Sequence, residues 1–258
     1  MKKKRSFGRT VLKWIGGALA AFFAVTLLWV LILKWVPVLF TPLMIGRAIE
    51  YRDDPDFRTR KTWKSLDEIS PALMKAVITA EDNKFMEHKG FDFESIRDAA
   101  ETNRKRGKIA RGASTISQQT AKNVFLWSGR SWVRKGFEVY FTVLIENIWG
   151  KERIMEVYLN VIELGKGVYG AEAAARKYFN EPASKISTSQ ACLMAACLPN
   201  PIKRDISNPG NYTRGYAQTL QSRINNLAYP DWITRPGGSR SGKAAQTDRA
   251  ARSGKKVK

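Results

Sequence analysis

The stretch WIGGALAAFFAVTLLWVLIL, from Trp14 to Leu33, divides the chain into a membrane segment and the parts on either side of it. These twenty residues carry no charge and are bracketed by Lys13 and Lys34. A helix rises about 1.5 Å per residue, so the stretch would span about 30 Å, the thickness of a bilayer core. We therefore expect a retained transmembrane helix over residues 14–34.

A cleaved signal peptide is the alternative explanation for this stretch. Its apolar run is longer than the roughly 7–15 residues usual for such signals, and no small-x-small cleavage site ends it cleanly. Residues 1–13 hold six Lys or Arg. Under the positive-inside rule, this basic segment is cytoplasmic and the rest of the chain lies on the other side of the membrane.

The charge of the whole chain points to an anionic partner. Its 258 residues include 44 Lys and Arg against 23 Asp and Glu, a formal net charge of +21. Nucleic acid, a phosphate-bearing substrate and a membrane surface all fit such a balance. Residues 233–258 are rich in Gly, Ser and basic residues, which predicts a disordered basic tail.

The cysteine and histidine content is low. Cys192 and Cys197 lie in an apolar run and are interpreted as small core residues. The chain has one histidine and no Cys-x-x-Cys pair, which argues against an ordinary zinc site.

Beyond the membrane segment, periodicity and punctuation predict a mainly α-helical domain with little sheet. Residues 35–69 are interpreted as a juxtamembrane segment, with 36–45 at the membrane interface, followed by a polar linker. The domain itself is expected over residues 70–232. Apolar stripes, capping residues and glycines predict its helices, at about 71–85, 92–106, 115–127, 131–149, 151–160, 168–179, 187–198 and 212–228.

The stretch EDNKFMEHKGFD, from Glu81 to Asp92, holds four carboxylates and the only histidine. Glu81 follows an apolar helical stripe directly, and a carboxylate at such a border is a candidate acid or base with a raised pKa. Asp82, Glu87 and Asp92 fit caps, ion pairs or solvated groups. His88 fits either a base or a group that hydrogen-bonds a loop.

Two further stretches combine cations with polar groups. In GASTISQQTAKN, Thr115, Gln119 and Lys122 share one helix face, which fits either a diphosphate or sugar cradle or an ordinary capped surface helix. In RSWVRKGFE, Glu138 is spaced to pair with Arg134 and Lys135, as surface pairs commonly are. It also adjoins an apolar stripe, so it can face a cleft lined by these cations.

Five stretches follow one another along the chain: EDNKFMEHKGFD, GASTISQQTAKN, RKGFE, KERIMEVYLNVIELG and GVYGAEAAARKYF. In this order they resemble the motifs of the peptidoglycan glycosyltransferases that polymerise lipid II. The resemblance covers about residues 60–210, and one departure is Ala113, where the second motif often has a glycine. The chain is similar to the monofunctional members, since it has no room for a transpeptidase domain. The resemblance implies a lysozyme-like, two-lobed helical domain preceded by one transmembrane helix.

The resemblance also implies roles for single residues. Glu81 matches the general base of an inverting transfer, and Glu138 matches a second essential carboxylate. Lys122 and Arg130 match positions that contact the substrate diphosphate. Further substrate-binding positions are Ser114, Thr115, Gln118, Gln119, Asn123, Arg134 and Lys135. Supporting positions are Asp82, Phe85 and His88, with His88 expected to brace the turn that aims Glu81.

The remaining expectations concern partners and place. The resemblance implies lipid II, an undecaprenyl-diphosphate-linked glycan and the membrane as partners, and no nucleic acid. Other cell-wall synthesis and division proteins are left open, as is a divalent cation (Mg²⁺ or Mn²⁺) at Asp82; no cofactor is required by the sequence. The expected location is the bacterial inner membrane, single-pass, with the catalytic domain periplasmic. The alternatives are a lysozyme-like glycan hydrolase and a membrane-tethered scaffold that binds anionic polymers.

Overall fold

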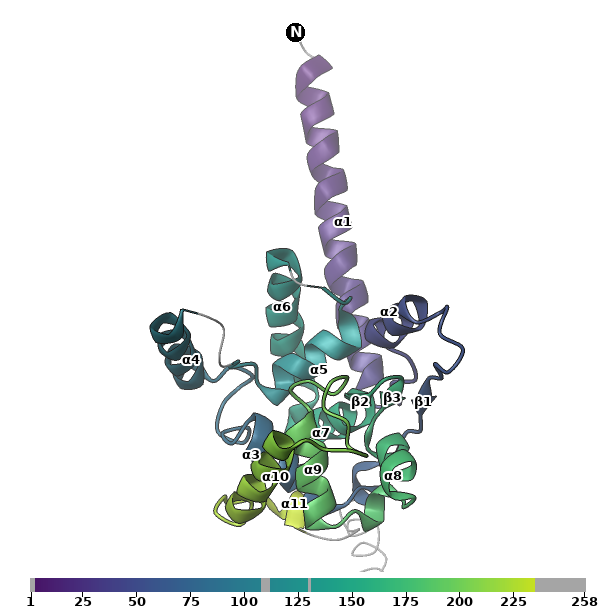
Figure 1. Ribbon diagram of the computed structural model, residues 1–258. Helices are drawn as coiled ribbons and strands as arrows, with labels where there is room; N and C mark the ends of the chain where they lie inside the picture. Colours follow the sequence, from purple (N-terminus) through teal and green to yellow (C-terminus); the bar gives the residue numbers. More distant parts are fainter. Residues whose placement is uncertain (1–2, 108–111, 130, 235–258) are drawn as a thin grey trace, which may run out of the picture.

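The computed structural model describes residues 3–107, 112–129 and 131–234. Its longest helix is α1 (Lys3–Leu33), which projects from a helical body (Figure 1). The part of α1 from Gly8 to Leu33 is long and apolar enough to cross a membrane. The predicted apolar helix is confirmed, and it continues towards the N-terminus into the basic segment. The predicted tail falls almost entirely outside the described residues.

The body is mainly helical, as predicted. Ten further α-helices follow in the described part of the chain: α2 (Pro42–Glu50), α3 (Pro71–Glu81), α4 (Phe93–Arg106), α5 (Ile116–Phe125), α6 (Trp132–Ile148), α7 (Gly150–Val161), α8 (Ala171–Phe179), α9 (Thr188–Cys197), α10 (Asn211–Arg223) and α11 (Asp231–Thr234). Two 3-10 turns are η1 (Leu66–Glu68) and η2 (Ala183–Lys185).

A small three-stranded sheet lies beside these helices. Its strands are β1 (Arg60–Lys61), β2 (Glu163–Gly165) and β3 (Val168–Tyr169), in the spatial order β1-β3-β2. β1 and β3 are parallel, whereas β2 and β3 are antiparallel. The predicted helix over 168–179 is thus wrong at its start, because 168–169 form β3 and Gly170 has a φ of 83° before α8 begins.

Helix capping agrees with the sequence predictions. Asp92 accepts a hydrogen bond from the Ser95 N–H (2.9 Å) at the start of α4. Capping boxes that begin at Thr115 and Ser187 open α5 and α9. These caps satisfy N–H groups that have no partner within the helix itself.

Helix α3 is shorter than predicted, and the difference determines where Glu81 lies. We expected the helix to reach Phe85, but Asp82 leaves the helical conformation with φ −163° and ψ 74°. Glu81 is therefore the last residue of α3. Phe85 lies in the following loop and is fully buried.

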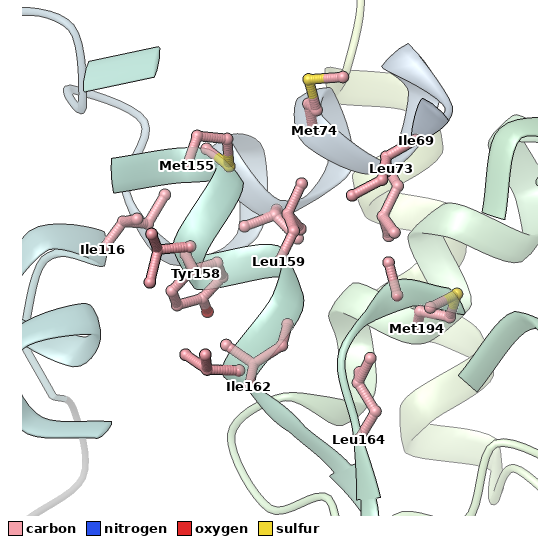
Figure 2. Packing of buried hydrophobic residues seen from close by; sticks show 14 of the residues in the cluster. Ile69, Leu73, Met74, Ile116, Met155, Tyr158, Leu159, Ile162, Leu164 and Met194 are labelled. Carbon is pink, nitrogen blue, oxygen red and sulfur yellow. The ribbon is translucent and has the colours of Figure 1, made fainter. Parts of the chain in front are cut away.

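Helix α7 is the centre of the core. Every residue from Ile154 to Val161 is buried. Figure 2 shows its Tyr158 with Ile116 of α5 on one side, and Met194 of α9 on the other side of the helix. Helices α5 and α6 pack on α7 and on each other, whereas α3, which carries Glu81, packs on α9.

The segment predicted to be a polar linker is part of the fold, which is a correction. Residues 46–69 include the end of α2, strand β1 and turn η1, and they bury Leu66 and Ile69 in the core. In the preceding segment Val38 and Met44 are buried, whereas Phe40 is exposed. The other domain boundaries stay predictions.

Helix α1 packs against the body along α6 (Figure 1). The hydroxyl groups of Thr26 and Tyr140 lie 2.7 Å apart, and the ring of Phe22 lies 5.9 Å from that of Tyr140. The indole N–H of Trp149 donates to the Val30 carbonyl (2.8 Å). Helix α6 is thereby aligned with the second half of α1.

The C-terminal end of α1 is bound by cations of the body. Arg153 donates to the carbonyl groups of Leu33 (2.8 Å) and Val36 (2.6 Å), and Lys61 donates to that of Val38 (2.5 Å). Cations suit this position because carbonyl groups at a helix end have no partner within the helix and carry partial negative charge.

Candidate active site

Glu81 lies at the end of α3 and faces α5. Its Oε2 accepts a hydrogen bond from Gln119 Nε2 (2.8 Å), and no cation of the described residues forms an ion pair with it. Burial raises the pKa of the Glu81 carboxyl group. The Gln119 hydrogen bond and the positive charges of Lys122 and Arg204 act in the opposite direction.

Asp82 has a different environment from its neighbour Glu81. Its Oδ2 accepts from the Ile116 N–H (2.9 Å) at the start of α5, and its Oδ1 lies 3.0 Å from His88 Nε2. The Gly90 N–H donates to His88 Nδ1 (3.1 Å), so Nε2 carries the proton that is donated to Asp82. Asp82 thus joins the end of α3, the following loop and the start of α5.

The metal possibility at Asp82 finds no support in its surroundings. Both of its carboxylate oxygens already accept hydrogen bonds from protein groups. Within the described ranges, no group of three or more His, Cys, Asp or Glu side chains is placed to hold a metal ion. The described residues around Asp82 do not fit a metal centre.

The predicted substrate-binding residues at the start of α5 divide into buried and exposed groups. Thr115 donates to the Gly90 carbonyl (2.7 Å) and forms a capping box with Gln118, and both side chains are buried. Asn123 is also buried, whereas Ser114 is exposed. Thr115 and Gln118 therefore bond to backbone groups at the start of α5 and at Gly90.

A polar cluster that was not predicted from the sequence lies beside the loop after Glu81. Ser117 donates to Glu146 of α6, which also pairs with Lys151 of α7 (2.6 Å). The Lys151 ammonium group lies 4.6 Å from the ring centre of Phe85. Gly90 packs against α6 beside this cluster and has a φ of +92°. A Cβ at this position would lie 2.8 Å from the Thr142 side chain, which is too close. The loop that follows Glu81 is therefore tightly packed.

Glu138 is the second buried carboxylate of the site. It lies in α6, where Arg134 Nη1 is 3.4 Å from its Oε2 and Lys135 Nζ contacts its Oε1. Arg134 Nε is buried and has no hydrogen-bond partner in the described structure. Arg130, predicted as a diphosphate contact, lies outside the described residues.

Lys122 interacts electrostatically with both Glu81 and Glu138. Its side chain is accessible to solvent, yet the protein around its ammonium group lowers its pKa by desolvation. The negative charges of Glu138 and Glu81 oppose this shift, and the positive charges of Arg134 and Lys135 add to it. Lys122 forms no ion pair in the described part of the chain. A cation that solvent can reach, but that the protein partly desolvates, is suited to bind an anionic group of a substrate.

Three residues near Glu81 were not singled out in the sequence. Tyr158 donates to Gln119 Oε1 (3.3 Å), and the Tyr216 hydroxyl donates to the Ala80 carbonyl (3.3 Å). Arg204 is placed by a hydrogen bond to the Ala196 carbonyl (2.8 Å). Tyr158 falls inside a quoted motif, but Arg204 and Tyr216 lie in a C-terminal region where no local pattern marks them.

The site therefore combines a carboxylate suited to accept a proton with cations suited to an anionic group. Burial raises the pKa of Glu81, and no cation of the described residues forms a salt bridge with it. Lys122, Arg134 and Lys135 can stabilise negative charge that develops on a leaving group. A reaction that deprotonates one group and releases an anion fits this arrangement.

Comparison with known proteins identifies the family of the chain. Residues 49–226 match the model of a family described as Transglycosylase. A biosynthetic peptidoglycan transglycosylase of Bdellovibrio bacteriovorus is 52% identical over 221 residues, which is 85% of this chain and 88% of the relative. One from Bacteroides thetaiotaomicron is 56% identical over 205 residues, covering 79% and 82%. A relative of the same name from Xanthomonas campestris is 42% identical over 230 residues, covering 88% and 93%.

Proposed function

The chain belongs to the transglycosylase family and is a peptidoglycan glycosyltransferase, and from this premise we propose that it polymerises lipid II with Glu81 as the general base. The products are β-1,4-linked glycan strands and undecaprenyl diphosphate. The observation that carries the mechanism is the environment of Glu81: burial raises its pKa, and the only hydrogen-bond donor to it among the described residues is a neutral amide.

The proposed reaction is a direct displacement at the anomeric carbon of the donor sugar. Glu81 accepts the proton of the 4-hydroxyl group of the acceptor GlcNAc while the hydroxyl oxygen bonds to that carbon. The bond from the carbon to the diphosphate oxygen breaks, and its electron pair stays on the diphosphate. The α-linkage of the donor becomes a β-linkage, as expected when the base acts on the attacking side of an inverting transfer.

The leaving diphosphate needs charge neutralisation more than it needs a proton. Lys122 is accessible and has no ion-pair partner among the described residues, so its charge is available to the substrate. Glu138 holds Arg134 and Lys135 on the same helix. In this role Glu138 positions cations, and the cations stabilise the charge that develops on the diphosphate.

His88 and Asp82 are proposed to support Glu81 without contacting substrate. Asp82 bonds His88 and the backbone of α5, and Glu81 is the residue next to it. A change in either group would move the end of α3 relative to Gln119, which donates to Glu81.

We further propose that α1 anchors the enzyme in the bacterial inner membrane with its catalytic domain in the periplasm. The basic segment before the apolar stretch supports the orientation. Because α6 packs along α1, the cations beside Glu138 are held near the membrane. A substrate whose diphosphate is attached to a lipid would present its charge at that level.

The test uses the purified full-length protein in detergent with labelled lipid II. We expect glycan strands and undecaprenyl diphosphate, with far less of both formed by a Glu81→Gln variant prepared in the same way. A protein that shortens mature glycan and leaves lipid II unchanged would instead be a hydrolase.

A further inference from the structure

Tyr158 is a fully buried phenol at the centre of the core whose hydroxyl group reaches the active site. It lies in α7 with no exposed surface, next to Ile116 at the start of α5 (Figure 2). Burial raises its pKa well above the ordinary value, and the negative charges of Glu81 and Asp82 act in the same direction. The hydroxyl group therefore keeps its proton and remains a hydrogen-bond donor.

The acceptor of this hydrogen bond is the side-chain amide of Gln119, and three contacts define the orientation of that amide. Its Nε2 lies 2.8 Å from Glu81 Oε2 and 3.4 Å from the Ser114 carbonyl oxygen. A carbonyl oxygen can only accept, so the nitrogen must face Ser114 and Glu81. Gln119 Oε1 then faces the Tyr158 hydroxyl at 3.3 Å.

These contacts form a directional chain from the core to the general base. The Tyr158 O–H donates to the Gln119 amide oxygen, and the amide N–H donates to the Glu81 carboxylate. Without the phenol, Oε1 would lose its protein donor, and the amide would lose a contact that opposes its rotation. A rotated amide would present an oxygen to the carboxylate, which is repulsive when Glu81 is ionised.

We propose that Tyr158 is a positioning residue that holds the Gln119 amide in the orientation that donates to Glu81. This inference rests on the proposed role of Glu81 as general base. Tyr158 touches no reacting atom; it acts on the base through Gln119. Its role is to maintain the hydrogen bond that stabilises the ionised, proton-accepting form of Glu81.

The other groups that act on Glu81 do not depend on this hydroxyl. Lys122 approaches from α5, Arg204 from the connection between α9 and α10, and Tyr216 from α10. Asp82 is the next residue in the chain. All of them remain in a Tyr158→Phe variant, so that variant isolates the chain through Gln119.

The test compares Tyr158→Phe with Tyr169→Phe in the full-length enzyme, using lipid II polymerisation across a range of pH. Tyr169 is equally buried, but its hydroxyl group contacts Glu163 (3.5 Å) and not the Glu81 chain. For Tyr158→Phe we expect kcat to fall about tenfold with little change in KM, because a hydrogen bond to a charged group is weakened. The Gln119 bond lowers the pKa of Glu81, so weakening it moves the acid limb of the kcat profile to higher pH. Tyr169→Phe is expected to keep the wild-type kcat and profile.

Three results would overturn the positioning role. The first is a Tyr158→Phe variant with a lower melting temperature but wild-type kcat and acid limb. It would show that the Tyr158 hydroxyl contributes to stability only. The second is a fall in kcat with the acid limb unmoved. The third is an equal effect of Tyr158→Phe with and without Gln119→Ala, since a residue acting through Gln119 has no target in that background. The wild-type enzyme assayed alongside separates these results from a failure of the proposed function, in which it would make no glycan.

Discussion

Glu81 and Glu138 are carboxylates of one site, Glu81 half-buried and Glu138 buried, and their surroundings differ in kind. Glu81 receives a hydrogen bond from a neutral amide of another helix and has a raised pKa. Glu138 contacts two cations, Arg134 and Lys135, both from its own helix. The first environment suits a group that must accept a proton, whereas the second suits a group that organises positive charge.

On the proposed mechanism, burial alone does not make a carboxylate a catalytic base. A buried carboxylate becomes a base where the protein leaves it without a cation, so that its proton affinity rises. Where cations surround it, the carboxylate is a structural counter-ion for them. Lys122 responds to the charge of both groups and is the point at which the two environments meet.

The largest effect is expected from Glu81→Gln. The amide keeps the shape of the side chain but cannot accept the proton, so lipid II polymerisation should fall by about 10²–10⁴-fold. Burial raises the pKa of Glu81 in the folded state, so its ionised form lowers stability as the pH rises through that pKa. The melting temperature of the variant at neutral pH should therefore equal or exceed that of the wild type. Substantial activity in this variant would remove Glu81 from the role of base.

Glu138→Gln should differ by lowering both activity and stability. Its removal leaves Arg134 and Lys135 close together without their shared counter-ion, and Arg134 is largely buried. Because the Lys135 side chain is 40% exposed, we expect a modest cost of about 1–3 kcal/mol. Thermal unfolding should show the loss of stability, and the rate of lipid II polymerisation should show the loss of activity. A variant as stable as Glu81→Gln would contradict the contrast between the two carboxylates.

Lys122→Ala tests whether the cation between the two carboxylates contacts the substrate diphosphate. We expect binding of lipid II to weaken about tenfold, as for the loss of a hydrogen bond to a charged group. Lys185→Ala, at an exposed lysine of η2, is the matched control and should bind normally. Affinity can be measured by titration with lipid II in detergent. Equal affinity of the two variants would exclude the diphosphate role of Lys122.

Arg204→Gln should have the smallest effect of these variants. It should change the pH dependence of kcat/KM. The base works when ionised, so kcat/KM falls as the pH drops through the pKa of Glu81. Burial raises this pKa and Arg204 lowers it, so losing the guanidinium should move the acid limb to higher pH. The measurement is the pH profile beside that of Lys203→Gln, an exposed neighbour. An acid limb that stays in place would show that Arg204 does not act on the base.

Features that depend on neighbouring residues were predictable from the sequence. The apolar run of α1, the capping boxes of α5 and α9 and the pairing of Glu138 with cations three and four residues before it all follow from helix geometry. The helix-start signals worked because a side chain caps the turn beside it. The helix-stop signals worked less well: α3 ends at Glu81 because Asp82 bonds to the start of α5, and no local pattern shows this.

The contacts that distinguish Glu81 join residues far apart in the chain. The bonds from Gln119 to Glu81 and from Tyr158 to Gln119 cross 38 and 39 positions, and the charge of Arg204 acts on Glu81 from beyond the end of α9 in the sequence. The sequence was sufficient for the membrane helix, the helical character of the domain and the charge pattern of α6, since these depend on spacing along one element. The proton affinity of Glu81 depends on which side chains surround it, and that was settled when α5 packed on the buried helix α7 and α3 packed on α9.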